Sequence, residues 1–145
     1  MGNIKITSPS FSEGEEIPDK FTCNGENINP ELDIENIPKN TKSLFLIVDD
    51  PDAPTGTFVH WLVYDIDKDV RKIEENSVPG KQVKNNFGKK EYGGPCPPSG
   101  THRYYFRLYA LDVEKLGDIK DMDEFDKKVE DHTIAKAELM GNFEK

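Results

Sequence analysis

Two histidines stand in matching positions, each just after a turn rich in glycine and proline. The turn before His60 reads DDPDAPTGT, and the turn before His102 reads GGPCPPSG; an apolar run follows each histidine. An imidazole gains or loses its charge near neutral pH, so it can bind anions, hold metals or transfer protons. We therefore expect the two histidines to serve one polar site at the ends of two strands.

The residues after His102 place a phenol beside the imidazole. Side chains alternate along a strand, so His102 and Tyr104 lie on one face while Arg103 points to the other. We expect Arg103 to pair with an acidic side chain of the scaffold, either Asp50 or Asp52. The imidazole and the phenol are then aimed at a common volume.

The second turn has the composition of an anion-binding loop. Gly93 and Gly94 let the backbone approach a ligand closely, and their N–H groups could form a nest for an anion. Pro95 and Pro97 stiffen the segment. An ordinary tight connection between strands has the same composition, so both interpretations stay open at this stage.

Two catalytic interpretations compete with binding. Cys96 could act as a nucleophile activated by His60 or His102, although a small buried thiol has the same signature. A metal could be held by Asp50, His60 and His102, although no HxD or HxxE spacing supports such a triad. Ser99 lacks the GxSxG context of a hydrolase nucleophile.

Cys23 and Cys96 belong to no CxxC motif, and no second pair completes a zinc site. The start of the chain has no basic region followed by an apolar run, as a signal peptide would have, and no apolar segment reaches membrane length. We therefore expect a cytoplasmic protein without stable membrane insertion. Free thiols are the expectation in that compartment.

The length and charge limit the classes of partner. A chain of 145 residues fits a single domain, 1–145, with a sizeable core. Its 28 acidic and 19 basic residues give a net charge of −9, and no basic stripe interrupts this balance. The sequence thus argues against a nucleic-acid-binding protein, which needs a clustered cationic surface.

The elements that must position these residues are mostly strands. Apolar runs of strand length occur at 44–48, 59–66 and 104–111, and their composition predicts burial on both faces. A short helix is predicted to begin near Asp121, where Asp121 and Glu124 resemble a capping box. Alternation from Ala135 to Phe143 predicts a closing strand. The sum is one mostly-β domain, either a sandwich or a barrel.

Two stretches together resemble a known family. DPDAP at 50–54 with HW at 60–61, followed by GGPCPPSGTHRYYFRLYALD at 93–112, is similar to the signature of the phosphatidylethanolamine-binding protein family. The likeness is closest to its bacterial and archaeal branch, known as Raf-kinase-inhibitor-like. The resemblance implies a Greek-key β-sandwich of two antiparallel sheets with one or two short helices.

The resemblance also implies a non-enzymatic binding site that needs no cofactor. It would be a small pocket for phosphate or a phosphoethanolamine headgroup. The ligand-binding residues would be Asp50, His60, Gly94, Pro95, His102 and Tyr104, and the rim would comprise Asp52, Pro54, Cys96 and Pro97. Family members often have a cis peptide at the end of DPDAP, so we expect Ala53–Pro54 to be cis.

The resemblance further implies partners. These are a phosphate-like or phosphoethanolamine-like small anion, a kinase or serine protease that the protein inhibits, and a second copy of the chain in a homodimer. The chain lacks the C-terminal helices of eukaryotic members, so we expect a more open pocket or one covered by a second subunit. In the first turn we expect Asp50 to approach His60, Asp52 to pin the turn, and Asp49 to be solvated.

Overall fold

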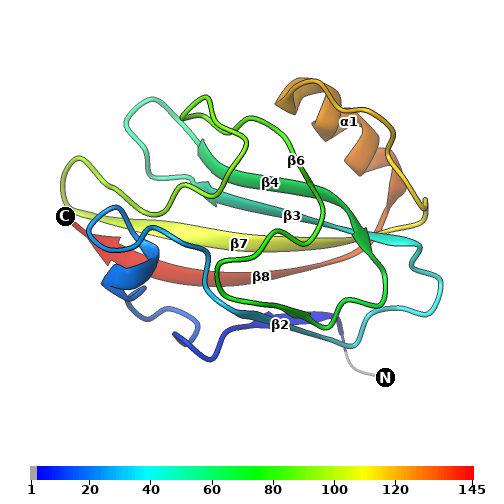
Figure 1. Cartoon of the computed structure of the whole chain (residues 1–145), viewed down its shortest axis with the longest axis horizontal. Coiled ribbons are helices and arrows are strands. Elements are labelled where there is room, and N and C mark those ends of the chain that lie inside the picture. Colours follow the sequence, from blue (N-terminus) through cyan, green and yellow to red (C-terminus); the bar gives the residue numbers. More distant parts are fainter. Residues whose placement is uncertain (1–2) are drawn as a thin grey trace.

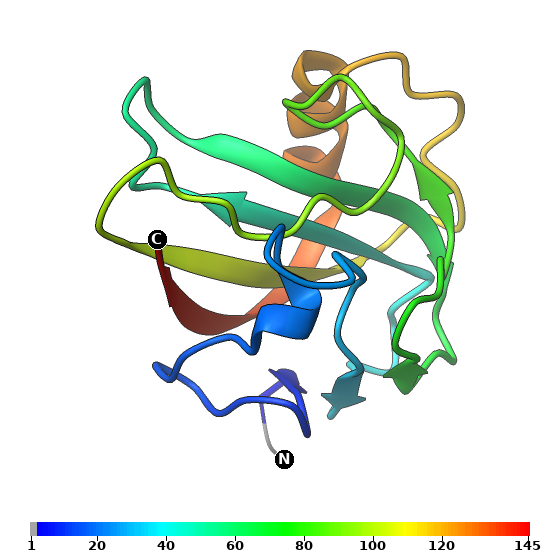
Figure 2. The same cartoon turned by 60° about the vertical axis from the view of Figure 1, so that its left-hand side comes forward.

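The computed structural model describes residues 3–145 and builds three layers around a five-stranded antiparallel sheet (Figures 1 and 2). A three-stranded sheet covers one face, and a single α-helix covers part of the other. The middle sheet has the order β6 (Lys81–Gln82), β4 (Phe58–Asp67), β3 (Ser43–Asp50), β7 (Thr101–Leu111) and β8 (Thr133–Glu144). The small sheet has the order β1 (Lys5–Thr7), β2 (Leu32–Glu35) and β5 (Lys72–Ile73), and the helices are η1 (Asp19–Phe21) and α1 (Met122–His132).

The connectivity of the middle sheet is that of a Greek key. Strand β4 pairs with β3, and β6 pairs with β4 after the chain has passed through β5 of the small sheet. Strand β7 then returns by a long connection to pair with the free side of β3. The predicted sandwich of two antiparallel sheets is confirmed. Its helices are one α-helix and the single 3₁₀ turn η1.

The main core lies between the two sheets because the inner faces of their strands are apolar. Leu46 of β3, Phe106 of β7 and Ile34 of β2 are all buried in this cluster. A second cluster lies on the outer face of the middle sheet, where Phe125 of α1 packs on Phe45. Burial of these apolar side chains contributes the main favourable free energy of the fold.

Burial on both faces was predicted for three strands and holds best for β3. In β7, side chains from Tyr104 onward alternate between buried and half-buried, so for this strand the prediction was wrong. The reason is the position of α1, which covers the outer face only toward the end of β7 that carries Leu111. Tyr105 and Arg107 therefore lie on a partly open face.

The predicted helix and closing strand are confirmed. Helix α1 begins after Asp121, whose carboxylate accepts a hydrogen bond from the Glu124 N–H at 2.9 Å. The reciprocal half of a capping box is shifted, since the Glu124 carboxylate accepts from the Lys120 N–H instead. Strand β8 begins directly after the helix, at Thr133. Within residues 3–145, no helix is long and apolar enough to cross a membrane.

Candidate functional site

The two motif turns meet at one end of the middle sheet. Strand β3 ends at Asp50 and β7 begins at Thr101, and the two strands are antiparallel. The loop at 51–57 and the loop at 93–100 therefore lie at the same end, on the left in Figure 1. This arrangement brings the predicted site residues from β3, β4 and β7 together.

A β-bulge determines where His60 points. Trp61 pairs with Val48, whereas the next pair joins Asp49 to Val59, so His60 is the extra residue of the bulge. The bulge turns His60 toward Tyr104, and the centroids of these two rings lie 5.3 Å apart. Strict alternation on β4 would not have placed His60 and Trp61 together on the inner face.

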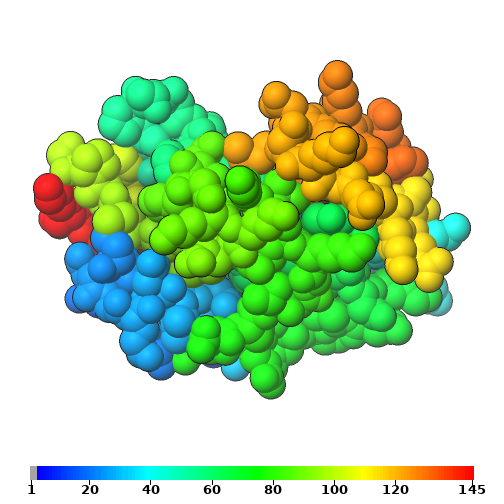
Figure 3. All heavy atoms as spheres, turned by 45° about the horizontal axis from the view of Figure 1, so that its top comes forward, coloured from blue at the N-terminus to red at the C-terminus, as the bar shows by residue number. Residues whose placement is uncertain are grey.

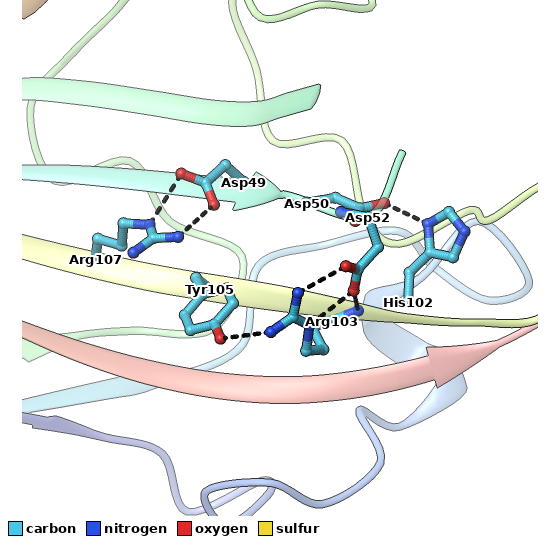
Figure 4. Close-up of polar contacts among 7 residues, drawn as sticks. All are labelled: Asp49, Asp50, Asp52, His102, Arg103, Tyr105 and Arg107. Carbon is cyan, nitrogen blue, oxygen red and sulfur yellow. Dashed lines mark hydrogen bonds and ion pairs between the residues drawn. The ribbon is translucent and has the colours of Figure 1, made fainter. Parts of the chain in front are cut away.

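Asp50 binds His102 rather than His60, so the predicted approach of Asp50 to His60 was wrong. The Asp50 carboxylate lies 2.6 Å from His102 Nδ1, and both side chains are buried (Figure 4). Asp50 continues the inner-face alternation of β3, and His102 lies on the same face of the neighbouring strand β7. The carboxylate therefore accepts the hydrogen bond of Nδ1–H and fixes the tautomer and the orientation of the His102 ring.

The neighbouring aspartates have structural contacts. Asp52 forms a two-pronged ion pair with Arg103, at 2.9 and 2.7 Å, and its N–H donates to Asp50 (Figure 4). Arg103 holds the pKa of Asp52 down at about 2. These contacts confirm that Arg103 pairs with an acid of the first turn and that Asp52 pins that turn.

Asp49 is buried and pairs with Arg107 at 3.0 Å, so the expectation of a solvated carboxylate was wrong. Its side chain follows the outer-face alternation of β3, where Arg107 lies diagonally across on β7 and donates to it. Burial raises the pKa of Asp49, and the Arg107 guanidinium acts against this rise. Asp49 therefore belongs to the scaffold on the outer face, away from the imidazoles.

The hydrogen bond of His60 fixes its tautomer. Its Nδ1 lies 2.7 Å from the carbonyl oxygen of Gly93. A carbonyl only accepts, so Nδ1 carries the hydrogen and the neutral ring leaves Nε2 as an acceptor. Burial lowers the pKa of His60. In both His60 and His102, Nε2 forms no hydrogen bond with the described part of the chain, and each becomes a donor only when the ring is protonated.

The hydroxyl of Tyr104 is an orphan between these two rings. It is fully buried, and although the Asp50 carboxylate and the Cys96 backbone lie near it, it forms no hydrogen bond of normal geometry in residues 3–145. Burial raises its pKa, and the charge of Asp50 acts in the same direction, whereas the backbone of Cys96 acts in the opposite one. The phenol therefore stays protonated and can donate to a ligand. A buried polar group without a partner costs about 1–3 kcal/mol, which makes it notable.

The glycines of the second turn do not form a free anion nest. The Gly93 N–H donates to the His60 carbonyl, and the Gly94 N–H donates to the Asn27 carboxamide at 2.7 Å. A Cβ at Gly94 would collide with the Phe21 carbonyl, and one at Gly93 would collide with the Phe87 ring. Both glycines are needed for close packing within the protein. The sequence did not reveal that Asn27 anchors this turn, because the segment CNGEN has the composition of an ordinary turn.

Cys23 and Cys96 form a disulfide, so the expectation of free thiols was wrong. The pairing arises because the second turn lies against the segment after η1, where the Cys23 N–H donates to the Pro95 carbonyl at 3.1 Å. Both cysteines are exposed. A disulfide-bonded Cys96 has no thiol, which removes the nucleophile of the hydrolase alternative.

The remaining rim residues are proline positions. Pro95 and Pro97 are buried, whereas Pro54 is exposed on the first turn. No peptide bond among residues 3–145 is cis, so the cis prediction for Ala53–Pro54 was wrong. The chain reverses instead through Gly56, whose φ of 113° only glycine adopts readily and whose N–H donates to the Ala53 carbonyl.

The metal alternative lacks a matching geometry. Across the described residues, no group of three or more His, Cys, Asp and Glu side chains is arranged to hold a metal ion. The third histidine, His132, pairs with Asp112 at 2.8 Å, beyond the far end of β7. It therefore lies away from the site.

Comparison with known proteins identifies the family. Residues 7–144 match the family model described as phosphatidylethanolamine-binding protein. The chain belongs to the phosphatidylethanolamine-binding protein (PEBP) family. This family assignment covers nearly the whole chain and agrees with both sequence signatures.

Relatives and solved structures agree with the PEBP assignment. A UPF0098 protein of Aquifex aeolicus is 51% identical over 122 residues, which cover 79% of this chain and 71% of that protein. The crystal structure of a candidate PEBP homologue from Chlamydia trachomatis is 40% identical, with a TM-score of 0.94 over 100% of this chain and 99% of the other. YbcL of E. coli, described as a member of the mammalian PEBP family, is 29% identical, with a TM-score of 0.91 over 99% of each chain.

Proposed function

We propose that this PEBP-family protein is a binding protein for phosphate-like groups, with the ligand held by Tyr104, His60 and His102. The observation that carries the proposal is the buried orphan hydroxyl of Tyr104 between two imidazoles. A phosphate oxygen accepts hydrogen bonds only, so it matches a phenol donor and two imidazolium N–H groups. Asp50 takes part by holding the His102 ring in place through its hydrogen bond to Nδ1.

Binding is expected to be weak and linked to protons. The net charge of −9 repels an anion at long range, so affinity must come from short contacts. His60 has a lowered pKa and donates from Nε2 only when it is protonated. Ligand binding should therefore take up a proton, and affinity should rise as the pH falls.

The proposal favours a binding protein over an enzyme. Cys96, the candidate nucleophile, is in a disulfide, and the Asp50 carboxylate already accepts hydrogen bonds from His102 and from the Asp52 N–H. We further propose that the site serves recognition of a phosphorylated group on a protein partner, as expected of a kinase or protease regulator. Phosphoethanolamine is the alternative ligand with the same phosphate chemistry.

NMR titration with inorganic phosphate tests this proposal. The side-chain signals of His60, His102 and Tyr104 should shift together along one saturable curve. The variant His60→Asn should weaken binding about tenfold, because one charged hydrogen bond is lost. The variant His132→Asn is the matched control, since His132 lies away from the site, and it should bind as the wild type does. Shifts confined to surface lysines would contradict the proposal.

A further inference from the structure

One loop beside the site presents an aromatic ring to solvent. Phe87 is 46% exposed, and it packs edge-on against both Phe58 and His60, with ring centroids 4.8 and 5.2 Å apart. Together these rings connect the buried imidazole to the surface. Among the described residues, the large hydrophobic side chains that are exposed are Phe87 and Val78.

The loop that carries Phe87 is rigid because a buried side chain organises it. The Asn85 carboxamide donates to the carbonyls of His60 and Glu91, and it accepts from the N–H groups of Phe87 and Lys89. All the hydrogen-bonding positions of Asn85 are thus used inside the protein. The ring of Phe87 is therefore held in place before any partner arrives, which lowers the entropic cost of binding.

Unpaired cations flank Phe87 in the sequence. Lys84, Lys89 and Lys90 are exposed, and none forms an ion pair within residues 3–145. Residues 84–90, KNNFGKK, contain no acid, although the whole chain carries −9. Figure 3 shows the segment around 84–91, in yellow-green, on the molecular surface next to the turn at 51–57. We call Lys84, Phe87, Lys89 and Lys90 the basic aromatic lip.

We propose that the basic aromatic lip docks an acidic, apolar peptide segment of a partner protein, whose phosphorylated side chain enters the Tyr104 site. This inference rests on the proposed function and names the partner of that site. The lysines complement acidic residues of the peptide, and Phe87 receives an apolar side chain next to the phosphorylated residue. At physiological salt, charges separated by more than about 8 Å are largely screened, so the local contacts of the lip decide the binding rather than the net charge of the chain.

The burial of the site favours a peptide over a membrane surface. His60 is 3% exposed and His102 is 7% exposed. A phosphate at the end of a single side chain suits such a buried site better than the phosphate of a bilayer lipid, which is a diester with substituents on both sides. A single exposed phenylalanine also gives too little apolar surface for firm insertion into a bilayer.

Calorimetric titration with two matched peptides tests the proposal. The first probe is a short acetylated peptide with a central phosphoserine flanked by leucine and glutamate. The second has glycine and glutamine in place of leucine and glutamate, and inorganic phosphate is the third probe. We expect the first peptide to bind about tenfold more tightly than the second, because apolar burial and charge pairing each contribute.

Variants of the lip should remove this preference selectively. The change Phe87→Ala should lower the ratio of peptide affinity to phosphate affinity about fivefold. The double change Lys89→Glu with Lys90→Glu should lower it by about the same factor, without touching the core. Val78→Ala and Lys39→Glu are matched controls, since these side chains are also exposed but lie outside the lip, and both should preserve the ratio.

The outcomes of these titrations distinguish the lip proposal from the proposed function. If phosphate binds but the two peptides bind alike, or if the control variants lower the ratio equally, the lip proposal is overturned while the proposed function stands. If neither phosphate nor peptide binds, both fail. If the lip variants abolish binding to phosphatidylserine vesicles and leave peptide binding unchanged, the lip serves a lipid surface and the peptide proposal is wrong.

Discussion

At the scale of single residues, the site is determined by which polar atoms remain free. Alternation on β7 correctly placed His102 beside Tyr104, because β7 pairs with β8 without interruption in this region. The glycine N–H groups looked free in the sequence, yet they are bonded within the protein. The sequence could not show this, since their partners come from distant segments. The orphan hydroxyl of Tyr104 is visible only in three dimensions.

The change Tyr104→Phe separates binding from stability. The substitution removes a buried hydroxyl that has no partner, so the free energy of unfolding should stay the same or rise by about 1 kcal/mol. Phosphate affinity should fall about tenfold, because a donor to the anion is lost. Urea denaturation and phosphate titration of the same samples measure both quantities. A destabilised variant with unchanged affinity would assign the hydroxyl a structural role.

The change Asp50→Asn tests the support of His102. Asparagine keeps one carboxamide oxygen, which can still accept from the Asp52 N–H, so the turn and the domain should remain folded. Its NH2 group then faces His102 Nδ1 in place of a carboxylate oxygen, so the hydrogen bond that fixes the tautomer of His102 is lost and phosphate affinity should fall about tenfold. Asp69→Asn, at an exposed aspartate, changes the net charge equally and should leave affinity unchanged.

At the scale of elements, local patterns predicted the strands and the helix but not the irregularities that aim the side chains. The apolar runs located β3, β4 and β7 to within a few residues. The bulge at His60 left no signal in the apolar pattern, since β4 is buried on both sides at that point. The disulfide depends on the contact between η1 and the second turn, so the cysteine spacing could not reveal it.

Removal of the disulfide should weaken the anchoring of the second turn. The double change Cys23→Ser with Cys96→Ser releases a cross-link over 73 positions, which should lower the free energy of unfolding by about 4 kcal/mol. Within the described chain, the backbone groups of 97–99 form no hydrogen bond that would replace it. Denaturant unfolding of the wild type, with and without a reducing agent, provides the comparison. If reduction changes nothing, the hydrogen bonds of Pro95 and Gly94 suffice to hold the turn.

At the scale of the whole molecule, the burial of His60 makes the free energy of unfolding depend on pH. The folded state holds the pKa of His60 below its ordinary value. Between that lowered pKa and about 6.5, the unfolded chain binds more protons, so stability rises with pH through this window. Acidification therefore costs stability while it favours anion binding, and a bound anion should offset the loss.

This opposition can be measured by denaturation in a non-binding buffer. Between about pH 7 and about pH 5.5, the free energy of unfolding of the wild type should fall by up to about 1 kcal/mol more than that of His60→Asn. Added phosphate should restore stability in the wild type at the lower pH and have little effect in the variant. Equal pH profiles for the two proteins would mean that His60 does not titrate as its burial indicates.

The most direct test of the central claim is the affinity for sulfate as a function of pH. Sulfate keeps its charge across the neutral range, so any change in affinity reports on the protein alone. If protonated His60 holds the anion, affinity should fall by up to about tenfold per pH unit above the lowered pKa of His60, and the ring signals of both histidines should shift on binding. An affinity that is the same at about pH 5.5 and pH 8, or that leaves the histidine signals unmoved, would contradict the account.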